Sequence, residues 1–485
     1  MNVEKPKSAK RASTYHALKW NSVNWTIVKS KVNELQSRIA KACKDNKMNL
    51  VKKLQYLLCR SYYAKLLAVK RITSNTGKRT AGIDKEKWLT SARKHQGAIS
   101  LSNKRYRSKS LKRIYIKKKN GKKRPLGIPT YYDRAMQSLY LMSLDPVSEV
   151  LLDQTSFGFR KNRSAKDACA YLFKCLSRQH SSQWILEGDI KGCFDNISHN
   201  WLVDKCPMDK SILKQFLKSG YVYKRELYST YSGTPQGGII SPTLANLALN
   251  GMSQMLKEKY WTNTVGTIDR QYNDQKLNIT VYADDFVVTA RSKQVLEDVK
   301  VMIERFLKIR GLELSKEKTV ITHIEKGFNF LGWNFKKYKD KLIIKPSSES
   351  LKSVSKKIKE AVQSGKSQTQ EMMITKLNQI IRGWCNYHKH ICAKKTFQTL
   401  DRITFYYVWN WTKQRHPMKS KTWRKTRYFE KRGERDWIFV SVNKRLLFAS
   451  DIKIKRHTLI KFAANPYLRK YDEYYLKRKT CGLKT

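Results

Sequence analysis

The tetrapeptide Tyr282-Ala283-Asp284-Asp285 constrains the fold of this chain more than any other feature. It lies between Leu277–Val281 and Phe286–Ala290, two runs rich in β-branched residues, which predicts two antiparallel strands joined by a tight acidic turn. A third carboxylate, Asp189, ends another apolar run, which begins at Trp184. Three carboxylates at strand ends suit a pair of Mg²⁺ ions, which take oxygen ligands. The alternative is an acidic turn that closes an exposed hairpin.

The charge of the chain indicates a polyanionic partner. Its 485 residues include 100 Lys and Arg against 38 Asp and Glu, for a formal net charge of +62. Such self-repulsion destabilises a compact state, whereas contact with phosphates is favoured because condensed counterions are released. A ribosomal-type protein or a binder of membrane surfaces is the alternative. With 40% hydrophobic and 11% aromatic residues, the chain can bury several cores, which predicts three or four folded domains.

Several features argue against membrane, secretory and zinc-binding classes. The sequence has no run of 18 apolar residues, and no apolar segment follows its basic first residues. Nine cysteines are scattered without a CxxC pair, which fits free thiols in a reducing compartment. Cys385, His388, His390 and Cys392 form one cluster of potential zinc ligands. On one helix, however, the two cysteines would lie about 10 Å apart, whereas zinc ligands converge from separate elements, so zinc is not expected.

The first 75 residues carry two helical patterns. Apolar residues recur at helical spacing from Val32 to Ala42 and again from Val51 to Tyr62. Asp45-Asn46-Lys47 separates the two runs, since Asp and Asn favour turns. Lys and Arg fill the outward faces, which suits either contact with nucleic acid or an ordinary solvated face.

Three later segments have recognisable patterns. Within the basic stretch 104–123, Leu111–Lys117 alternates as a strand does, and Asn120-Gly121 predicts a hairpin turn. A helical pattern with lysines on its polar face runs from Ser347 to His388 and predicts a three-helix unit. From Trp411 onward, basic side chains interleave with aromatic ones, which suits contact with phosphates and stacking on bases.

Two motifs beside the carboxylates suit nucleotide chemistry. Phe194 follows Asp189 by five residues, where a bulky side chain would lie under the incoming sugar of a nucleotidyl-transferase and exclude a 2′-hydroxyl. A core aromatic is the alternative, and the neighbouring Asp195 leaves a polar contact to that hydroxyl open. The Gly-rich segment Gly233–Pro242 ends in a predicted helix start, with Ser241 as the cap and Pro at the first helical position. Such a turn favours phosphate, although a purely structural turn is a rival.

Taken together, these segments resemble a group II intron reverse transcriptase and maturase. They follow the order of that family and cover nearly the whole chain. The matching segments are Trp20, Asn24-Trp25, Leu35–Ile39, Leu67–Arg71, Gly77–Asp84, Arg124–Pro129, Phe157–Arg160, Arg163–Ala165, Asp167-Ala168, Asp189–Asn196, Thr234–Pro242, Tyr282–Asp285, Gly311–Thr319, Phe330–Trp333, Ile381–His388, Arg415–Pro417, Arg456-His457 and Ala464–Tyr467.

The resemblance implies an α+β fold: a right-hand polymerase with palm and fingers, then a helical thumb and maturase domain, then a basic C-terminal nucleic-acid-binding segment. The implied boundaries are an N-terminal extension with basic helices at 1–75, fingers and palm at 76–340, thumb and maturase domain at 341–430, and a DNA-binding segment at 431–485. Many relatives continue into a Cys-rich HNH-type endonuclease, which has no counterpart before Thr485, so cutting of duplex DNA is not expected. Lys161-Asn162 stand where Pro-Gly is commoner, a change that is not expected to matter.

The resemblance also assigns roles to matching residues. Asp189, Asp284 and Asp285 would be catalytic and hold two Mg²⁺ ions, which Mn²⁺ can replace. Because successive strand residues face opposite ways, we expect Asp189 and Asp284 to be the main ligands and Asp285 the weaker one. The nucleotide-binding residues would be Lys117, Arg124, Phe194, Gln236 and Gly237. The primer would contact Gly332 and Trp333. The expected contacts to RNA or DNA are Arg160, Arg163, Arg382, Trp384, Arg415, His416, Arg456 and His457.

The implied function is an RNA-directed DNA polymerase that also binds its group II intron RNA to assist splicing and supports intron mobility by target-primed reverse transcription. The partners would be intron RNA, an RNA template with a DNA primer, dNTPs and target DNA, without a membrane; a ribonucleoprotein and a homodimer are both compatible. A bacterial cytoplasm is expected, with an organelle matrix or stroma as the alternative. A splicing maturase with little polymerase activity and an intron-independent, retron-like or defence reverse transcriptase are the rivals. The intact acids disfavour the first, and residues 381–467 the second.

Overall fold

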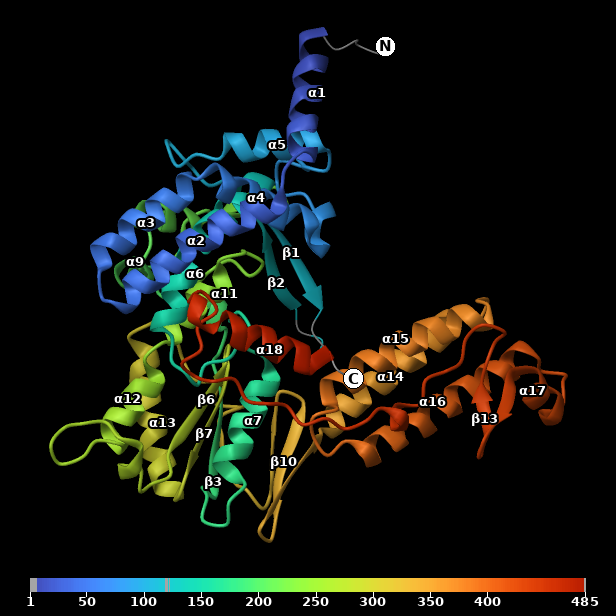
Figure 1. Ribbon diagram of the computed structural model, residues 1–485. Coiled ribbons are helices and arrows are strands. Elements are labelled where there is room, and N and C mark those ends of the chain that lie inside the picture. Colours follow the sequence, from blue (N-terminus) through green and yellow to red (C-terminus); the bar gives the residue numbers. More distant parts are fainter. Residues whose placement is uncertain (1–6, 118–120, 122, 484–485) are drawn as a thin grey trace.

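The computed structural model describes residues 7–117, 121 and 123–483 of the chain (Figure 1). Helices and mixed or antiparallel sheets occur together, which confirms the predicted α+β class. Two clusters of buried hydrophobic side chains hold the structure together. One joins the N-terminal helices, the fingers and one face of the palm sheet. The other joins the opposite face of that sheet to the C-terminal half. None of the helices in the described part of the chain is long and apolar enough to cross a membrane.

Helices form the N-terminal layer, and the predicted break between the first two long patterns is confirmed. The helix α2 ends at Lys44, and α3 begins at Met48. Tyr62 was expected to end the second pattern, but it begins the next helix because Ser61 has an extended backbone (φ −61°, ψ 127°). The elements of this layer are α1 Lys7–Asn21, α2 Trp25–Lys44, α3 Met48–Arg60, α4 Tyr62–Ser74, the 3-10 helix η1 Thr76–Arg79 and α5 Ser91–Ser100.

The fingers contain a four-stranded sheet in the order β2-β1-β4-β5. The predicted strand Leu111–Lys117 is confirmed as β1, and it pairs antiparallel with β2. The expected turn at Asn120-Gly121 falls mostly outside the described residues. Gly127 on β2 donates its backbone N–H to the Gln236 carbonyl, which ties this sheet to the Gly-rich turn below it. The strands are β1 Leu111–Lys117, β2 Lys123–Ile128, β4 Tyr221–Tyr223 and β5 Glu226–Tyr228.

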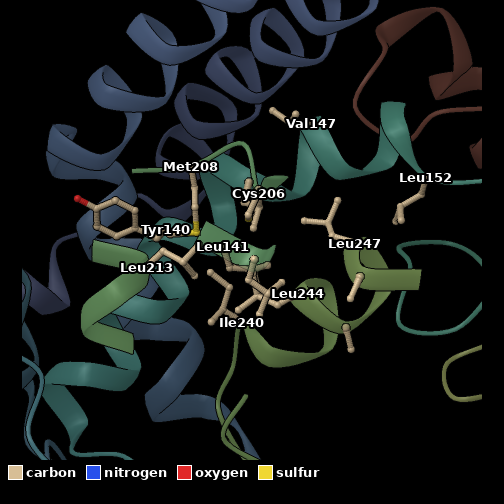
Figure 2. Close-up of a cluster of buried hydrophobic side chains, with 14 of the residues drawn as sticks. Tyr140, Leu141, Val147, Leu152, Cys206, Met208, Leu213, Ile240, Leu244 and Leu247 are labelled. Atoms are coloured by element: carbon tan, nitrogen blue, oxygen red, sulfur yellow. The ribbon is translucent and has the colours of Figure 1, made fainter. Parts of the chain in front are cut away.

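A long central helix, α6 (Tyr131–Leu151), connects the fingers to the palm and buries nearly all of its side chains. Its first turn is capped by Thr130, whose hydroxyl accepts the backbone N–H of Asp133. Figure 2 shows side chains of α6, among them Tyr140 and Leu141, packed with apolar residues that come from later helices of the palm. Because α6 is covered on most sides, it forms the centre of the hydrophobic core in this half of the molecule.

The palm is built on an antiparallel sheet in the order β6-β7-β3-β8. Ile185 and Val287 belong to the core shared with the C-terminal half, whereas Leu186 and Val288 belong to the core shared with α6. The strands are β3 Trp184–Asp189, β6 Asn278–Tyr282, β7 Asp285–Ala290 and β8 Val320–His323. The helices are α7 Ala165–Leu176, α8 Cys193–Asn196, α9 His199–Lys205, α10 Lys210–Leu217, α11 Ser241–Leu249, α12 Met252–Tyr260, η2 Arg270–Tyr272 and α13 Lys293–Lys308.

The start of α11 differs in detail from the prediction. Pro242 lies in the first turn, as expected, but the cap position is Ile240 and not Ser241. The Ser241 hydroxyl instead donates to the Pro235 carbonyl at 2.9 Å, so it closes the Gly-rich turn onto itself. A serine beside a tight turn can bond either way, and the sequence pattern does not distinguish the two.

A small sheet follows the palm and packs beside it, and a three-helix unit then extends away from the palm (Figure 1). The lysine-faced pattern from Ser347 to His388 forms two helices, α14 and α15, and the third helix of the unit, α16, lies beyond the predicted range. The elements are β9 Phe328–Phe330, β10 Trp333–Tyr338, β11 Lys341–Pro346, α14 Ser348–Ser364, α15 Gln370–His388, α16 Lys394–Arg415, α17 Lys421–Tyr428, β12 Phe429–Arg432, β13 Arg435–Phe439, η3 Ala449–Asp451, η4 Arg469–Tyr471 and α18 Asp472–Leu483.

Residues 456–478, here called the C-terminal strap, return from the three-helix unit to the palm. The Tyr467 hydroxyl donates to Asp145 at the end of α6 (2.6 Å), and Lys161 lies over the Tyr467 ring. Phe462 packs edge-on against Tyr171 of α7, with ring centroids 5.3 Å apart. Lys161 therefore has a structural contact, although a substitution at this place was not expected to matter. The strap therefore covers part of the palm and buries apolar side chains there.

Asp167, in the first turn of α7, fixes the strap to the palm. Its carboxylate accepts the backbone N–H of Ile460 (3.0 Å), lies 2.9 Å from His457 Nε2 and is also bonded by Arg478. It also accepts the backbone N–H and hydroxyl of Ser164, which completes a capping box. Burial alone would raise the pKa of Asp167, but His457 and then Arg478 outweigh it and lower the pKa to about 2. The charged form therefore stabilises the folded state.

We predict that Asp167→Asn lowers the free energy of unfolding by about 3 kcal/mol at pH 7, because His457 and Arg478 would lose a buried anionic partner. A folded pKa of about 2, below the ordinary 3.8, means that this stabilisation is complete above pH 4 and disappears as the pH falls through 2. Urea denaturation at pH 7 and pH 3 should show a difference between wild type and variant that shrinks with acidification.

The matched control is Glu473→Gln, which removes an exposed carboxylate from the same strap. Its urea midpoint should equal that of wild type, because an exposed ion pair contributes little to stability. If Asp167→Asn unfolded at the wild-type midpoint at pH 7, the charge of Asp167 would not be what holds the strap.

Candidate active site

The three acidic residues of the opening motif meet at one end of the palm sheet. Asp189 ends β3, Asp285 begins β7, and the two are paired across the strands. Tyr282 pairs with Asp285 in the hairpin β6-β7, so Asp284 lies in the two-residue turn between them. Ala283 has a left-handed backbone (φ 58°), an uncommon conformation for a residue other than glycine. All three carboxylates are half-buried.

This arrangement changes the expected order of the carboxylates. Side-chain alternation predicted that Asp285 would point away from Asp189 and Asp284. Residues paired across antiparallel strands project on the same side, so Asp285 lies beside Asp189. The alternation rule was extended through a turn, and the left-handed Ala283 breaks it. The geometry therefore gives no reason to rank Asp285 as the weaker ligand.

The electrostatics of the site favour a cation. Burial, followed by the charges of Asp284 and Asp189, raises the pKa of Asp285 to about 7. Three carboxylates this close repel one another, so a cation among them would be stabilising. Their oxygen atoms are the ligands that hard divalent cations such as Mg²⁺ prefer, and in this respect the residues fit a divalent metal.

Lys318 supplies positive charge at this place in the structure. Its Nζ lies 3.0 Å from both carboxylate oxygens of Asp189. The backbone N–H of Ser315 donates to the Asp189 carbonyl (2.8 Å), which holds the segment of Lys318 beside β3. Because Lys318 occupies both carboxylate oxygens, it would have to move before a metal ion could bind Asp189. As they now stand, the three aspartates have the right type of oxygen ligand but, like every other group of three or more His, Cys, Asp or Glu side chains in the described part of the chain, are not placed to hold a metal ion.

The sequence reasoning did not single out Lys318. It lies 129 residues after Asp189 and follows a loop, so no local periodicity connects the two. The segment Gly311–Thr319 carried the family resemblance, and its lysines were the available signal. A lysine in a chain with 100 basic residues does not stand out by type.

Phe194 and the Gly-rich turn lie next to the carboxylates. Phe194 is half-buried and packs edge-on against Phe159, with ring centroids 6.2 Å apart. Its carbonyl accepts the backbone N–H of Thr234 at 2.6 Å. Gly237 has φ 110°, and a Cβ there would lie 2.7 Å from the Gly127 carbonyl, so a larger residue would push the turn away from the fingers.

Two basic residues of the fingers were expected to bind the nucleotide. Lys117 ends β1 with its side chain exposed. Arg124, on β2, is also exposed, and its Nε donates to Gln236 Oε1 at 2.7 Å. Gln236 in turn donates to Asp195 at 2.8 Å. The structure therefore brings Arg124 and Gln236 into direct contact.

The expected primer contact consists of a turn with a buried tryptophan behind it. Gly332 has φ 81°, which suits glycine. The Trp333 side chain is fully buried; its Nε1 donates to His388 Nδ1 (2.9 Å), and its ring stacks on Tyr387. The Ser350 hydroxyl lies 3.0 Å from His388 Nε2, so the histidine is engaged on both sides and not as a metal ligand. Trp333 can support the primer only through the turn that it holds in place.

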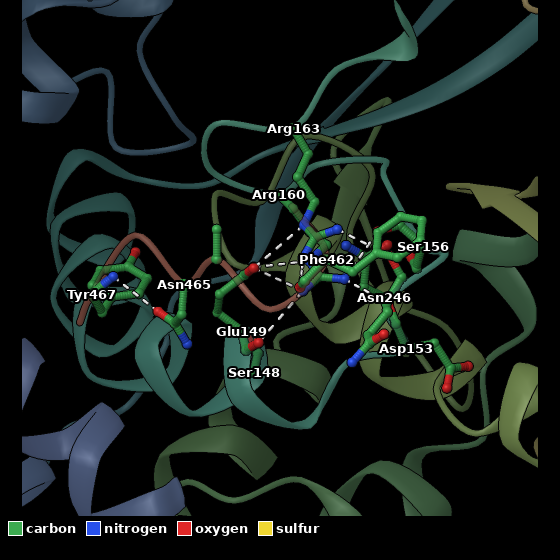
Figure 3. Close-up of polar contacts among 12 residues, drawn as sticks. Ser148, Glu149, Asp153, Ser156, Arg160, Arg163, Asn246, Phe462, Asn465 and Tyr467 are labelled. Atoms are coloured by element: carbon green, nitrogen blue, oxygen red, sulfur yellow. Dashed lines mark hydrogen bonds and ion pairs between the residues drawn. The ribbon is translucent and has the colours of Figure 1, made fainter. Parts of the chain in front are cut away.

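Two of the expected nucleic-acid contacts are buried instead. Arg160 forms an ion pair with Glu149 of α6 at 2.7 Å, and Arg163 contacts the same carboxylate at 3.4 Å (Figure 3). Arg160 also donates to the carbonyls of Asp153 and Ser156. In this structure neither arginine can contact RNA or DNA, because both side chains are buried and are held inside the palm by the shared Glu149 carboxylate. The sequence showed the arginines but not this partner.

The remaining expected contacts divide by exposure. Arg382 and Arg456 are exposed. Arg415 is exposed, and its Nη1 donates to the carbonyls of the loop before α15. The other three are half-buried and engaged within the protein: Trp384 with Ser350 (3.0 Å), His416 with Tyr428 (2.6 Å) and His457 with Asp167 (2.9 Å).

Comparison with known families agrees with this layout. Residues 116–335 match the reverse transcriptase (RNA-dependent DNA polymerase) family, residues 20–101 the N-terminal domain of reverse transcriptase, and residues 351–429 the group II intron maturase-specific domain. The chain belongs to the group II intron reverse transcriptase family. The predicted resemblance is confirmed.

Two similar bacterial proteins illustrate the likeness, and one of them is a group II intron protein. The chain is 31% identical to the group II intron-encoded protein LtrA of Lactococcus lactis subsp. cremoris, over 62% of this chain and 59% of LtrA. It is also 31% identical to protein YkfC of Escherichia coli K12, over 62% of this chain and 87% of YkfC. The chain thus spans about three fifths of LtrA. Apo telomerase from Candida tropicalis has 14% identity and a TM-score of 0.39, covering 64% of this chain and 57% of that one, too remote a likeness to support any inference.

We predict that Lys318→Gln increases the affinity of the site for divalent metal by about threefold, because the ammonium group no longer competes for Asp189. Titration with Mn²⁺, followed by the loss of free-ion electron paramagnetic resonance signal, measures this affinity without any reaction. Lys316→Gln removes the same charge two residues away and should leave the affinity near the wild-type value. Weaker binding by Lys318→Gln would show that Lys318 assists the metal.

Proposed function

We propose that this protein is an RNA-directed DNA polymerase that also binds a group II intron RNA and assists its splicing. The observation that carries the polymerase proposal is the meeting of Asp189, Asp284 and Asp285 at one end of the palm sheet. The raised pKa of Asp285 shows that their charges act on one another. The match of residues 116–335 to the reverse transcriptase family supports the same activity.

The reaction would join a primer 3′-hydroxyl to the α-phosphate of a dNTP with release of pyrophosphate. Asp189, Asp284 and Asp285 would hold two Mg²⁺ ions, or Mn²⁺ in their place. When bound, the metal lowers the pKa of the attacking hydroxyl and stabilises the charge that develops on the phosphate. Lys117 and Arg124 would bind the triphosphate, with Gln236 and Gly237 beside it. Phe194 would exclude the 2′-hydroxyl of a ribonucleotide.

The domain boundaries are those that the sequence resemblance implied. We infer that residues 1–75 form the N-terminal extension, 76–340 the fingers and palm, 341–430 the thumb and maturase domain and 431–485 the basic DNA-binding segment. The family matches at 20–101, 116–335 and 351–429 support the order of these units. The strap belongs to the last unit by sequence, yet it packs on the palm. Nucleic acid would therefore contact the exposed side chains of that unit, such as Arg456.

The proposed RNA partner is a structured group II intron. The maturase-specific match at residues 351–429 and the net charge of +62 support it. Exposed Arg382 on α15 is the first candidate contact. An RNA template with a DNA primer, dNTPs and target DNA complete the proposed partners, with intron mobility by target-primed reverse transcription as the outcome. A ribonucleoprotein in a bacterial cytoplasm fits the LtrA likeness, and an organelle would be the other location.

We predict that Asp284→Asn lowers the rate of cDNA synthesis by at least about a thousandfold, because the metal site loses a charged ligand. Binding of intron RNA should remain within about twofold of wild type, since the basic surface is unchanged. Primer extension on an RNA template and filter binding of the intron RNA measure the two effects. Equal loss of both would contradict separate polymerase and RNA-binding surfaces.

The matched control is Asp298→Asn, which removes an exposed carboxylate from α13. Its primer extension should equal that of wild type. If the wild-type protein binds intron RNA but extends no primer in Mg²⁺, the protein is a splicing factor without polymerase activity. If it extends primers but retains no intron RNA when recovered from cells, the maturase part of the proposal fails.

A further inference from the structure

One glutamine connects the fingers to the palm at the nucleotide site. Arg124 Nε on β2 donates to Gln236 Oε1 at 2.7 Å. Gln236 Nε2 donates to Asp195 Oδ2 at 2.8 Å. The backbone joins the same partners, because Gly127 N–H donates to the Gln236 carbonyl at 2.7 Å. Arginine, glutamine and aspartate thus form a continuous chain of hydrogen bonds between two parts of the fold.

The chemistry of the end groups fixes the direction of this chain. A guanidinium group can only donate hydrogen bonds, and an ionised carboxylate can only accept them. The Gln236 amide therefore has one orientation, with its oxygen toward Arg124 and its nitrogen toward Asp195. Removing the Asp195 carboxylate would free the amide to rotate. Arg124 would then lose the partner that sets the plane of its guanidinium group.

The Asp195 end of the chain is firmly held. Thr234 N–H donates to the Phe194 carbonyl at 2.6 Å, and the Ser232 hydroxyl donates to the Asp195 carbonyl at 3.1 Å. At Gly233 the two segments are so close that a Cβ would lie 2.5 Å from the Asp195 carbonyl oxygen. The Gly-rich turn therefore fixes the backbone of Asp195, and the exposed carboxylate extends from this fixed point to Gln236.

We infer that Asp195 is a positioning residue for the incoming nucleotide, which it serves by orienting Arg124 through Gln236. This inference rests on the proposed polymerase function. Because Gln236 occupies Nε, Arg124 would present the edge formed by its two terminal nitrogens to the triphosphate. Asp195 also follows Phe194 directly, so the same support would keep the triphosphate contact in register with the sugar contact.

The competing role for Asp195 is a direct hydrogen bond to a sugar hydroxyl. The structure favours positioning, since Oδ2 is turned toward Gln236 and the Gln236 side chain reaches on to the fingers. The two roles differ in what a variant would change. Loss of positioning weakens the binding of every dNTP, whereas loss of a sugar contact changes the preference between dNTPs and ribonucleotides.

The test compares steady-state primer extension by the full-length protein carrying Asp195→Ala or Asp195→Asn. We expect Asp195→Ala to raise KM for dTTP about fivefold, with kcat within about twofold, since one hydrogen bond in the chain is lost. Asp195→Asn should return KM to within about twofold of wild type, because its amide oxygen still accepts from Gln236. Asp204→Ala, which removes an exposed carboxylate on α9, should leave KM and kcat unchanged.

A double variant separates positioning from a general structural effect. If Asp195 acts through Gln236, Asp195→Ala combined with Gln236→Met should have the same KM as Gln236→Met alone. Additive increases in KM would overturn the inference. It would equally be overturned by a KM for Asp195→Ala within twofold of wild type, by no rescue in Asp195→Asn, or by a changed ratio of dTTP to UTP incorporation without a change in KM.

A binding measurement distinguishes failure of this inference from failure of the proposed function. A primer that ends in a dideoxynucleotide cannot be extended, so the stability of its complex with protein, template and dTTP reports nucleotide binding alone. If wild type extends no primer, the polymerase proposal fails. The positioning role can still be tested in that case. It stands if dTTP stabilises the wild-type complex about fivefold more than the Asp195→Ala complex, and equal stabilisation would overturn it.

Discussion

Mutual repulsion among Asp189, Asp284 and Asp285 is the interaction around which the palm is arranged. Like charges separate unless the backbone prevents it, and here the β3-β7 register sets Asp189 opposite Asp285. The residue before Asp189 makes this close pairing possible. At Gly188 a Cβ would lie 2.1 Å from the ring of Phe286, so any side chain would displace this buried ring from its place over the strand pair. The site therefore depends on a glycine that takes no part in its chemistry.

The acidic turn is held from behind as well. Phe157 N–H donates to the Val281 carbonyl (2.9 Å), and Val281 N–H donates to the Thr155 carbonyl (3.0 Å), so the loop before α7 adds to the edge strand β6. Arg160 holds this loop through the Asp153 and Ser156 carbonyls. The buried ion pair between Arg160 and Glu149 thus supports the acidic turn from within the protein. Through Asp167, the strap closes over the same region.

Much of the fold was predictable because its elements have strong local signals. The β6-β7 hairpin, the strand Leu111–Lys117 and the first two helices after the palm each follow from periodicity and turn residues. Gathering of the three acids followed from their placement at strand ends. Their relative orientation did not, because a left-handed Ala283 changes the direction of the chain within two residues. The Ser241 cap failed for a similar reason: its hydroxyl had a second acceptor, in the Gly-rich turn, that no local pattern reveals.

Several of the contacts that sequence reasoning missed join charged residues far apart in the chain. Lys318 meets Asp189 from 129 residues away, and the strap meets Asp167 from about 290 residues away. Arg160 and Arg163 show the opposite error: they were expected to contact nucleic acid, but they are buried against Glu149. A net charge of +62 indicates a polyanion partner for the whole chain, but it cannot say which cation faces outward. The buried acids Glu149 and Asp167 are each paired with basic residues that only the folded structure identifies.

Binding of nucleic acid and reaction at the acidic site need opposite charges. The excess of lysine and arginine attracts phosphates at long range, whereas the acidic end of the palm sheet repels them at short range. A phosphate can therefore approach Asp189, Asp284 and Asp285 only when a cation has neutralised them, even though the rest of the surface holds nucleic acid without one. Lys318 neutralises Asp189 in part, but as a side chain it cannot replace a multivalent ion shared by three carboxylates. Affinity for nucleic acid is thus a property of the whole surface, and reaction a property of one neutralised site.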